Sequence, residues 1–334
     1  MNHLQKLHEN FNQSPWVDNL SRELISSGKL QDYIDKGVRG LTSNPTIMEN
    51  AITGSNAYDE QISLLMNDGL TAEQIYWKLV EDDIRAATTL LKPVWDASHG
   101  IDGYVSLEVS PELSDDALAT AAQAKQLWED LAIPNLMIKV PATDGSVPAI
   151  HELLQAGINV NVTLIFSLDH YRQVAEAHRS THKLGHVNNA RSVASFFISR
   201  VDNEIDARLT AIGTEKALNL RGQAAIAQAH LAYAIFLEQF GDAAVLEPES
   251  SAIQRLLWAS TSTKNPDYDD LLYVKYLIAP HTVNTLPEPT IEKIIDHLGD
   301  DARSLSLDDI VHAQHIIRQI AEVGIDMEDV AKTL

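Results

Sequence analysis

Short apolar runs alternate with helix-like segments along almost the whole chain. Eight runs of apolar and β-branched residues, each bounded by turn-forming residues, predict β-strands. In chain order the predicted strands are residues 16–21, 38–44, 103–110, 136–142, 159–166, 192–199, 256–262 and 276–284. Because strands separated by helices usually pair in parallel, this pattern indicates a parallel sheet with helical crossovers.

The segments between the strands carry helix signals. In segment 71–91, Thr71 and Gln74 have the spacing of a capping box, and apolar residues then recur at near-helical intervals. Segment 114–131 begins with Ser114, which is a candidate helix cap.

We expect an α/β fold, a single (β/α)8 (TIM) barrel domain over residues 1–334. Extra helices are expected around 51–100 and 285–334, where the chain is longer than eight strand–helix units need. The competing architecture is a doubly wound open sheet. That fold usually has a G-x-G-x-x-G turn after an early strand, and the chain contains no such motif.

Net charge and cysteine content exclude several kinds of binding partner and chemistry. The chain of 334 residues has a formal net charge of −22, which argues against nucleic acid and anionic membranes as partners. It has no cysteine, so disulfides, thiolate metal sites and cysteine nucleophiles are excluded. The first residues lack a signal-peptide pattern, and no apolar run has the length of a membrane span. We therefore expect a soluble cytoplasmic protein, and an anionic metabolite is not excluded as a ligand because a few local cations can build a phosphate pocket.

A lysine interrupts the apolar strand "NLMIKVPAT" at Lys139. Burial disfavours an ammonium group, and a neutral amine attacks ketones and aldehydes to give a Schiff base. Glu108 on the preceding strand is a candidate acid/base, and Asp18 is a candidate for taking a proton from a substrate hydroxyl. The alternative is that Lys139 and Glu108 form a buried ion pair without chemistry.

Other polar side chains also share strand faces. By the two-residue strand period, the sets are Thr42 with Asn44, Ser106 with Glu108 and Ser110, and Asn159 with Asn161 and Thr163. They could converge at the carboxyl-terminal mouth of a barrel, where Asn44 and Asn161 would bind the hydroxyls of a polyol. Alternatively, Asn161 and Thr163 satisfy each other and nearby backbone groups, and Asp18 caps a helix near Ser21.

Two cations follow late predicted strands. Arg200 comes after "SFFIS" and Lys264 after "WASTST", so both are expected at the same barrel rim. Arginine and lysine there suit a phosphate group. The alternative is surface pairing with acids such as Asp202.

Three histidines in "HRSTHKLGH" are spaced four residues apart, at His178, His182 and His186. This spacing can bind a metal on a helix. The motif has no carboxylate, however, and Gly185 weakens the last helical turn. We therefore favour a solvated helix face over a metal site.

An ordered set of motifs resembles the transaldolase family from about Trp16 to about Ala331. The motifs are "WVDNLSRELI", "GLTSNPTI", "VSLEVSPELS", "MIKVPATDGSVPAI", "NVNVTLIFSLDHY", "SFFISRVDN" and "LWASTSTKNPDY". The resemblance implies a Schiff-base (β/α)8 barrel of the pentose phosphate pathway. The implied reaction moves a dihydroxyacetone unit from sedoheptulose 7-phosphate or fructose 6-phosphate to an aldose phosphate, glyceraldehyde 3-phosphate or erythrose 4-phosphate. No metal or organic cofactor is implied.

The resemblance also assigns roles by position. It implies Lys139 as the Schiff-base nucleophile, Asp18 as the acid/base on the C4 hydroxyl, and Glu108 as the acid/base that works with water and Thr163. The implied substrate-binding residues are Asn44, Thr42, Asn161, Ser195, Phe197, Arg200 and Lys264. Many family members have arginine at the last position, and lysine cannot make the bidentate arginine fork.

Three rival functions remain. A related Schiff-base aldolase would release free dihydroxyacetone. The resemblance favours transfer instead, because Glu108 rather than a tyrosine occupies the expected acid/base position. A non-catalytic barrel that binds sugar phosphates would keep Lys139 charged. Metal-dependent hydrolysis would depend on the histidine series. The sequence is compatible with a monomer or a homodimer.

Overall fold

The computed structural model describes residues 1–143, 145–183, 189–241, 252–299 and 302–334, with the side chains of 182 and 183 left out. In this described part of the chain, eight parallel strands form one closed barrel in sequence order, and β8 pairs with β1. The (β/α)8 barrel is therefore confirmed, and the competing open sheet is wrong.

All eight predicted segments overlap a strand of the barrel. The strands are β1 (Gln13–Asp18), β2 (Leu41–Thr42), β3 (Val105–Glu108), β4 (Leu136–Pro141), β5 (Val160–Ile165), β6 (Ser192–Phe197), β7 (Gln254–Ala259) and β8 (Thr282–Leu286). The largest boundary error is at β8, which begins six residues after the predicted start. There Leu277 and Ile278 are buried in the turn after a helix, so their apolar character reflects packing outside the sheet.

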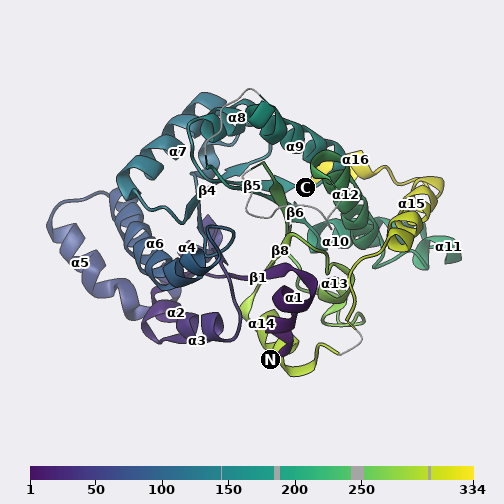
Figure 1. Cartoon of the computed structure of the whole chain (residues 1–334), viewed down its shortest axis with the longest axis horizontal. Coiled ribbons are helices and arrows are strands. Elements are labelled where there is room, and N and C mark those ends of the chain that lie inside the picture. Colours follow the sequence, from purple (N-terminus) through teal and green to yellow (C-terminus); the bar gives the residue numbers. More distant parts are fainter. Residues whose placement is uncertain (144, 184–188, 242–251, 300–301) are drawn as a thin grey trace.

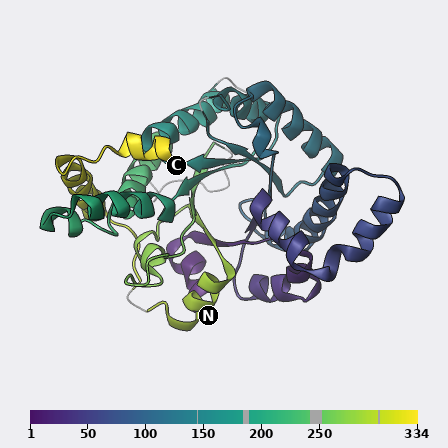
Figure 2. The same ribbon diagram turned by 180° about the vertical axis from the view of Figure 1, so that it is seen from behind.

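Helices surround the barrel on all sides (Figure 1). Within the described residues they are α1 (His3–Phe11), α2 (Arg22–Ser26), α3 (Lys29–Asp35), α4 (Pro45–Gly54), α5 (Asp59–Asn67), α6 (Ala72–Ala97), α7 (Ala117–Leu131), α8 (Val147–Gln155), α9 (Leu168–Lys183), α10 (Ser199–Ile212), α11 (Glu215–Leu218), α12 (Ala224–Phe240), α13 (Leu272–Tyr276), α14 (Glu288–His297), α15 (Leu307–Glu322) and α16 (Met327–Thr333). Helices are present in both regions where extra ones were expected. Seen from behind, α5 and α15 lie on opposite sides of the barrel (Figure 2).

Helix starts follow the capping chemistry, with one correction. Thr71 and Gln74 form the predicted capping box at the start of α6. The predicted cap Ser114 is wrong, because a short 3-10 turn precedes α7 and Asp116 caps that helix by accepting a hydrogen bond from the amide of Ala119. None of the helices described combines the length and apolar character that crossing a bilayer requires.

The histidine series is not a solvated helix face at its first member. His178 on α9 is fully buried, and its ring packs edge-to-face on Phe240 at a centroid distance of 5.8 Å. The solvated-face prediction is therefore wrong for His178. The side chain of His182 and the whole of His186 lie outside the described residues. Among the residues that are described, no group of three or more potential metal ligands occurs.

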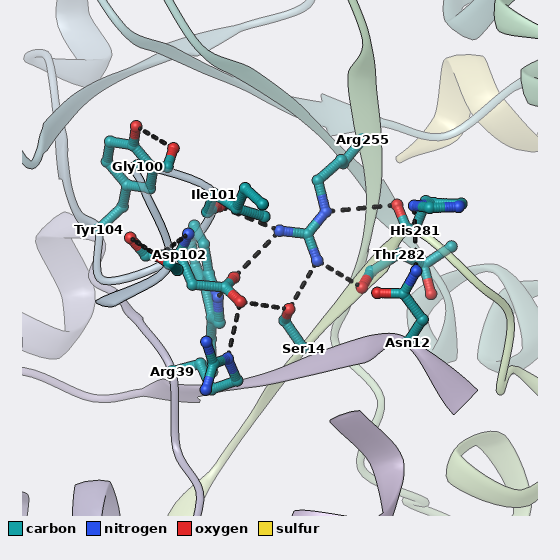
Figure 3. A network of polar contacts seen from close by, with 12 residues as sticks. Asn12, Ser14, Arg39, Gly100, Ile101, Asp102, Tyr104, Arg255, His281 and Thr282 are labelled. Atoms are coloured by element: carbon teal, nitrogen blue, oxygen red, sulfur yellow. Dashed lines mark hydrogen bonds and ion pairs between the residues drawn. The ribbon is translucent and has the colours of Figure 1, made fainter. Parts of the chain in front are cut away.

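A buried ion network closes the amino-terminal end of the barrel (Figure 3). Asp102, just before β3, is fully buried. Its carboxylate accepts hydrogen bonds from Arg39 Nε at 2.8 Å, Ser14 Oγ at 2.8 Å and a terminal nitrogen of Arg255 at 3.0 Å. Burial opposes its ionisation, but the two arginines outweigh this effect and hold the pKa of Asp102 well below its ordinary value. We call Ser14, Arg39, Asp102 and Arg255 the floor network.

Candidate active site

A cavity of about 340 Å³ lies at the opposite, carboxyl-terminal end of the barrel. Within the described chain, each of the eight strands contributes at least one residue to its wall. These strand residues are Asp18, Thr42, Glu108, Lys139, Thr163, Leu164, Ser195, Phe197, Ala259 and Thr285. The carboxyl ends of parallel strands in a barrel point into a common mouth, so side chains far apart in sequence converge there.

Ten of the eleven predicted site residues line this cavity. They are Asp18, Thr42, Asn44, Glu108, Lys139, Thr163, Ser195, Phe197, Arg200 and Lys264. The eleventh, Asn161, is fully buried and lies outside the cavity wall. The structure thus brings the predicted set together, while the role of each member stays a prediction.

Lys139 on β4 and Glu108 on the neighbouring strand β3 are paired in the register of the parallel sheet. Lys139 Nζ lies 2.8 Å from Glu108 Oε2 and donates a hydrogen bond of 3.1 Å to the carbonyl oxygen of Ser43. The lysine side chain is only 8% exposed and that of Glu108 12%. The ion pair that we considered as an alternative does form. It stands in the wall of the cavity, where a bound molecule can reach both groups.

Asp18 ends β1 on another side of the cavity. Its Oδ1 accepts a hydrogen bond of 2.7 Å from Thr42 Oγ1, which also lies 2.5 Å from Thr285 Oγ1. Burial raises the pKa of Asp18, although Lys139, the Thr42 hydrogen bond and Arg200 oppose the shift. Asp18 does not cap α2, because the side chain of Ser21 does so. A buried carboxyl group with a raised pKa is suited to exchange a proton near neutral pH.

Three amide and hydroxyl side chains show how the polar strand faces are used. Asn44 lines the cavity, and its Oδ1 caps α4 by accepting a hydrogen bond from the amide of Ile47. Asn161 donates to Ser106 Oγ at 3.0 Å and accepts from Ser195 Oγ at 2.7 Å. Thr163 Oγ1 is buried and has no hydrogen-bond partner within the described residues. Asn161 therefore supports the wall from behind, and Thr163 has a hydroxyl available to a substrate or water.

Arg200 and Lys264 provide positive charge at the rim. Arg200 follows β6 and its guanidinium lies 5.1 Å from the ring centroid of Phe197, in a cation–π contact. Neither cation has an ion-pair partner among the residues that the structure covers. Surface pairing of Arg200 with Asp202 is wrong, since Asp202 is buried and bonded to Ala225 and Tyr273. Two unpaired cations beside a cavity in so acidic a chain favour an anionic ligand.

Some cavity residues escaped sequence reasoning. Ser260 follows β7 with a positive φ of 58°, a conformation that no residue pattern signals. The carbonyl of Ser43 that accepts from Lys139 is a backbone group, which sequence does not distinguish. Thr285 is the next-to-last residue of β8 and follows another polar residue, Asn284, so the two-residue strand period does not single it out.

Comparisons with known proteins agree on one family. Residues 15–334 match the family described as Transaldolase/Fructose-6-phosphate aldolase. The chain is 46% identical over 333 residues to a transaldolase of Mycobacterium tuberculosis (strain ATCC 25618 / H37Rv), covering 96% of this chain and 88% of that protein. It is also 46% identical over 328 residues to a transaldolase of Mycobacterium marinum (strain ATCC BAA-535 / M), covering 95% and 87%.

One solved structure also resembles the chain, at a much lower level. It is described as a putative fructose-1,6-biphosphate aldolase from Coccidioides immitis. The alignment covers 99% of this chain and 93% of that chain at 9% identity, with a TM-score of 0.38. A likeness at that TM-score carries no structural argument.

Proposed function

Because the chain belongs to the transaldolase/fructose-6-phosphate aldolase family and has a transaldolase function, we propose that Lys139 is its Schiff-base nucleophile. The donors that we propose are sedoheptulose 7-phosphate and fructose 6-phosphate. The acceptors are glyceraldehyde 3-phosphate and erythrose 4-phosphate. The observation that carries this proposal is a buried lysine, 2.8 Å from a carboxylate, in the wall of a cavity whose rim has two unpaired cations.

The first step needs Lys139 as a free amine. Glu108 is close enough to take a proton from the ammonium group, and the Ser43 carbonyl orients the nitrogen. The amine then adds to the C2 carbonyl of the ketose. Glu108 returns the proton to the carbinolamine hydroxyl, which leaves as water and gives the iminium. The unpaired hydroxyl of Thr163 would hold that water.

The second step breaks the C3–C4 bond. Asp18 accepts the proton of the C4 hydroxyl, the C3–C4 electrons move to the iminium, and an aldose leaves while an enamine stays on Lys139. The raised pKa of Asp18 makes its carboxylate a stronger base and lets the acid form persist. In the reverse direction the enamine carbon attacks the acceptor aldehyde, and Asp18 protonates the new alkoxide. Hydrolysis of the iminium then frees Lys139.

Borohydride reduction in the presence of fructose 6-phosphate tests the proposal. We expect a stable dihydroxyacetone adduct, found by mass spectrometry on the peptide that contains Lys139. The acceptor distinguishes transfer from simple aldol cleavage, since an aldolase would release free dihydroxyacetone when no acceptor is added. An adduct on another lysine would move the site, and a folded protein without any adduct would refute Schiff-base chemistry.

Arg200→Ala is expected to weaken the binding of phosphorylated donors. Loss of a charge-assisted contact should raise KM for fructose 6-phosphate by about 10- to 100-fold. The rate of borohydride trapping with unphosphorylated dihydroxyacetone should change little. Arg172→Ala is the control, because Arg172 is exposed on α9 and pairs only with Glu238 among the described residues. An equal effect on both substrates would remove Arg200 from the phosphate site.

A further inference from the structure

The two rim cations stand on different elements of the fold. Arg200 is the second residue of α10, whereas Lys264 lies in the loop between β7 and α13, residues 260–271. Lys264 is exposed and has no ion-pair partner within the described ranges. The distance between the two charges is therefore set by how the loop is held against α10.

Two tyrosines connect this part of the chain to α10. Tyr268 Oη donates a hydrogen bond of 2.6 Å to Asp206 Oδ2, and Tyr273 Oη donates one of 2.9 Å to Asp202 Oδ2. The aspartates are four residues apart, so their carboxylates stand one helical turn apart on the same face of α10. We call these four residues the tyrosine–aspartate ladder.

The first turn of α12 and the residues just before it hold both aspartates from a second direction. Asp202 Oδ1 accepts a hydrogen bond of 2.7 Å from the amide of Ala225, and Asp206 Oδ1 accepts one of 2.9 Å from the amide of Gly222. Each carboxylate thus joins three segments of chain. Because Asp202 and Tyr273 are buried, the hydrogen bond between them is protected from competition by solvent.

Gly222 makes room for the outer rung of the ladder. Its φ is +72°, and a Cβ at this position would lie 2.9 Å from Cζ of Tyr268. Any other residue would therefore both strain the backbone and push the ring away. Burial raises the pKa of Tyr268 to about 12, with Asp206 adding to the effect, so the hydroxyl remains a donor.

The root of the loop is also bound to α10. The amide of Ser199 donates to the carbonyl of Ser260 at 3.0 Å, and the two hydroxyl oxygens lie 2.8 Å apart. The loop is thus tied to α10 at Ser260 and again at Tyr268. In the sequence, Lys264 lies midway between Ser260 and Tyr268.

We propose that the tyrosine–aspartate ladder positions Lys264 relative to Arg200, so that both cations can share the substrate phosphate. The inference rests on the phosphate role proposed above for these two residues. Lysine is a point charge on a flexible stem, so its placement depends on the backbone that carries it. A loop that is ordered before binding also lowers the entropic cost of capturing the anion. The four ladder residues are positioning residues, since none of them lines the cavity.

Tyr268→Phe and Tyr273→Phe test this inference, because each keeps the ring and removes one hydroxyl. We expect KM for fructose 6-phosphate to rise about three- to tenfold in each variant, which is the size of effect that one hydrogen bond supports. The value of kcat should stay within about twofold. Trapping with unphosphorylated dihydroxyacetone should be unchanged. If Tyr273→Phe fails to fold, the half-buried Tyr268 carries the test alone.

Tyr58→Phe is the matched control. Tyr58 Oη donates a hydrogen bond of 2.8 Å to the buried Asp83, in a tyrosine–aspartate pair away from the cavity. We expect this variant to lose stability without a change in KM. The ladder inference would be overturned if KM in Tyr268→Phe and Tyr273→Phe rose no more than in Tyr58→Phe. It would also be overturned if the ladder variants affected phosphorylated and unphosphorylated substrates equally.

Arg200→Ala, measured in parallel, separates the two proposals. If it raises KM and the ladder variants do not, only the ladder inference fails. If Arg200→Ala leaves KM unchanged, the phosphate assignment fails, and the ladder inference fails with it.

Discussion

Replacing Lys139 by alanine should lower turnover by about three orders of magnitude or more, since no other group in the cavity can form the Schiff base at the same place. The fold should persist. Glu108 loses its ion-pair partner, but it lies in the cavity wall, where water can solvate its carboxylate. Steady-state kinetics with fructose 6-phosphate and erythrose 4-phosphate measure the loss, and circular dichroism checks the fold.

Lys264→Ala is the matched control for this variant. It removes a lysine from the same cavity without removing the proposed nucleophile. Borohydride trapping with dihydroxyacetone should label the Lys264→Ala protein and fail to label Lys139→Ala. A Lys139→Ala protein that still turns over at a comparable rate would end the Schiff-base assignment to this residue.

Asp102→Asn should produce the largest loss of stability among the substitutions considered. The change leaves Arg39 and Arg255 close together without a buried counter-charge, and removing one partner of a buried ion network typically costs about 3–5 kcal/mol. Urea unfolding at pH 7 measures this loss. Asp96→Asn, which breaks an exposed pair with Lys92, should cost less than about 1 kcal/mol.

Acid should reduce the difference in stability between the wild-type chain and Asp102→Asn. The folded-state pKa of Asp102 lies below its ordinary value of 3.8, so the unfolded chain takes up a proton first as pH falls. The stabilisation from the carboxylate is therefore complete above that value and declines as pH falls toward the folded-state pKa. Unfolding at pH 7 and near pH 3 should show a smaller gap at the lower pH. A gap that does not change with pH would contradict this account.

The fold could be predicted because each strand is a local pattern, whereas strand ends depend on distant contacts. β1 begins at Gln13, three residues before its predicted start, and the side chain of Gln13 donates to the carbonyl of Leu277 and to Thr282 Oγ1. A polar residue satisfied by groups so far along the chain has no local signature. The floor network escaped prediction for the same reason, since Ser14, Asp102 and Arg255 meet only in the closed barrel.

The candidate site was predictable as a set but less so residue by residue. The two-residue period correctly placed Glu108 and Thr163 toward the barrel interior, and Lys139 was found as the lysine that interrupts an apolar strand. The same period does not say how deep a residue lies, so it did not distinguish Thr163 from Asn161, two positions earlier and below the cavity. Nor could it tell that the side-chain oxygen of Asn44 caps a helix.

The closure of the barrel has a consequence for how the chain folds. β1 shares only two paired positions with β2, but five with β8, where Gln13 and Thr282 are 269 residues apart. As the protein is synthesised, its first strand leaves the ribosome long before its main partner exists. Contacts at such sequence separation form slowly, and an unpaired strand edge can pair with other chains. The amino-terminal strand therefore remains an exposed aggregation hazard until almost the whole chain has been made.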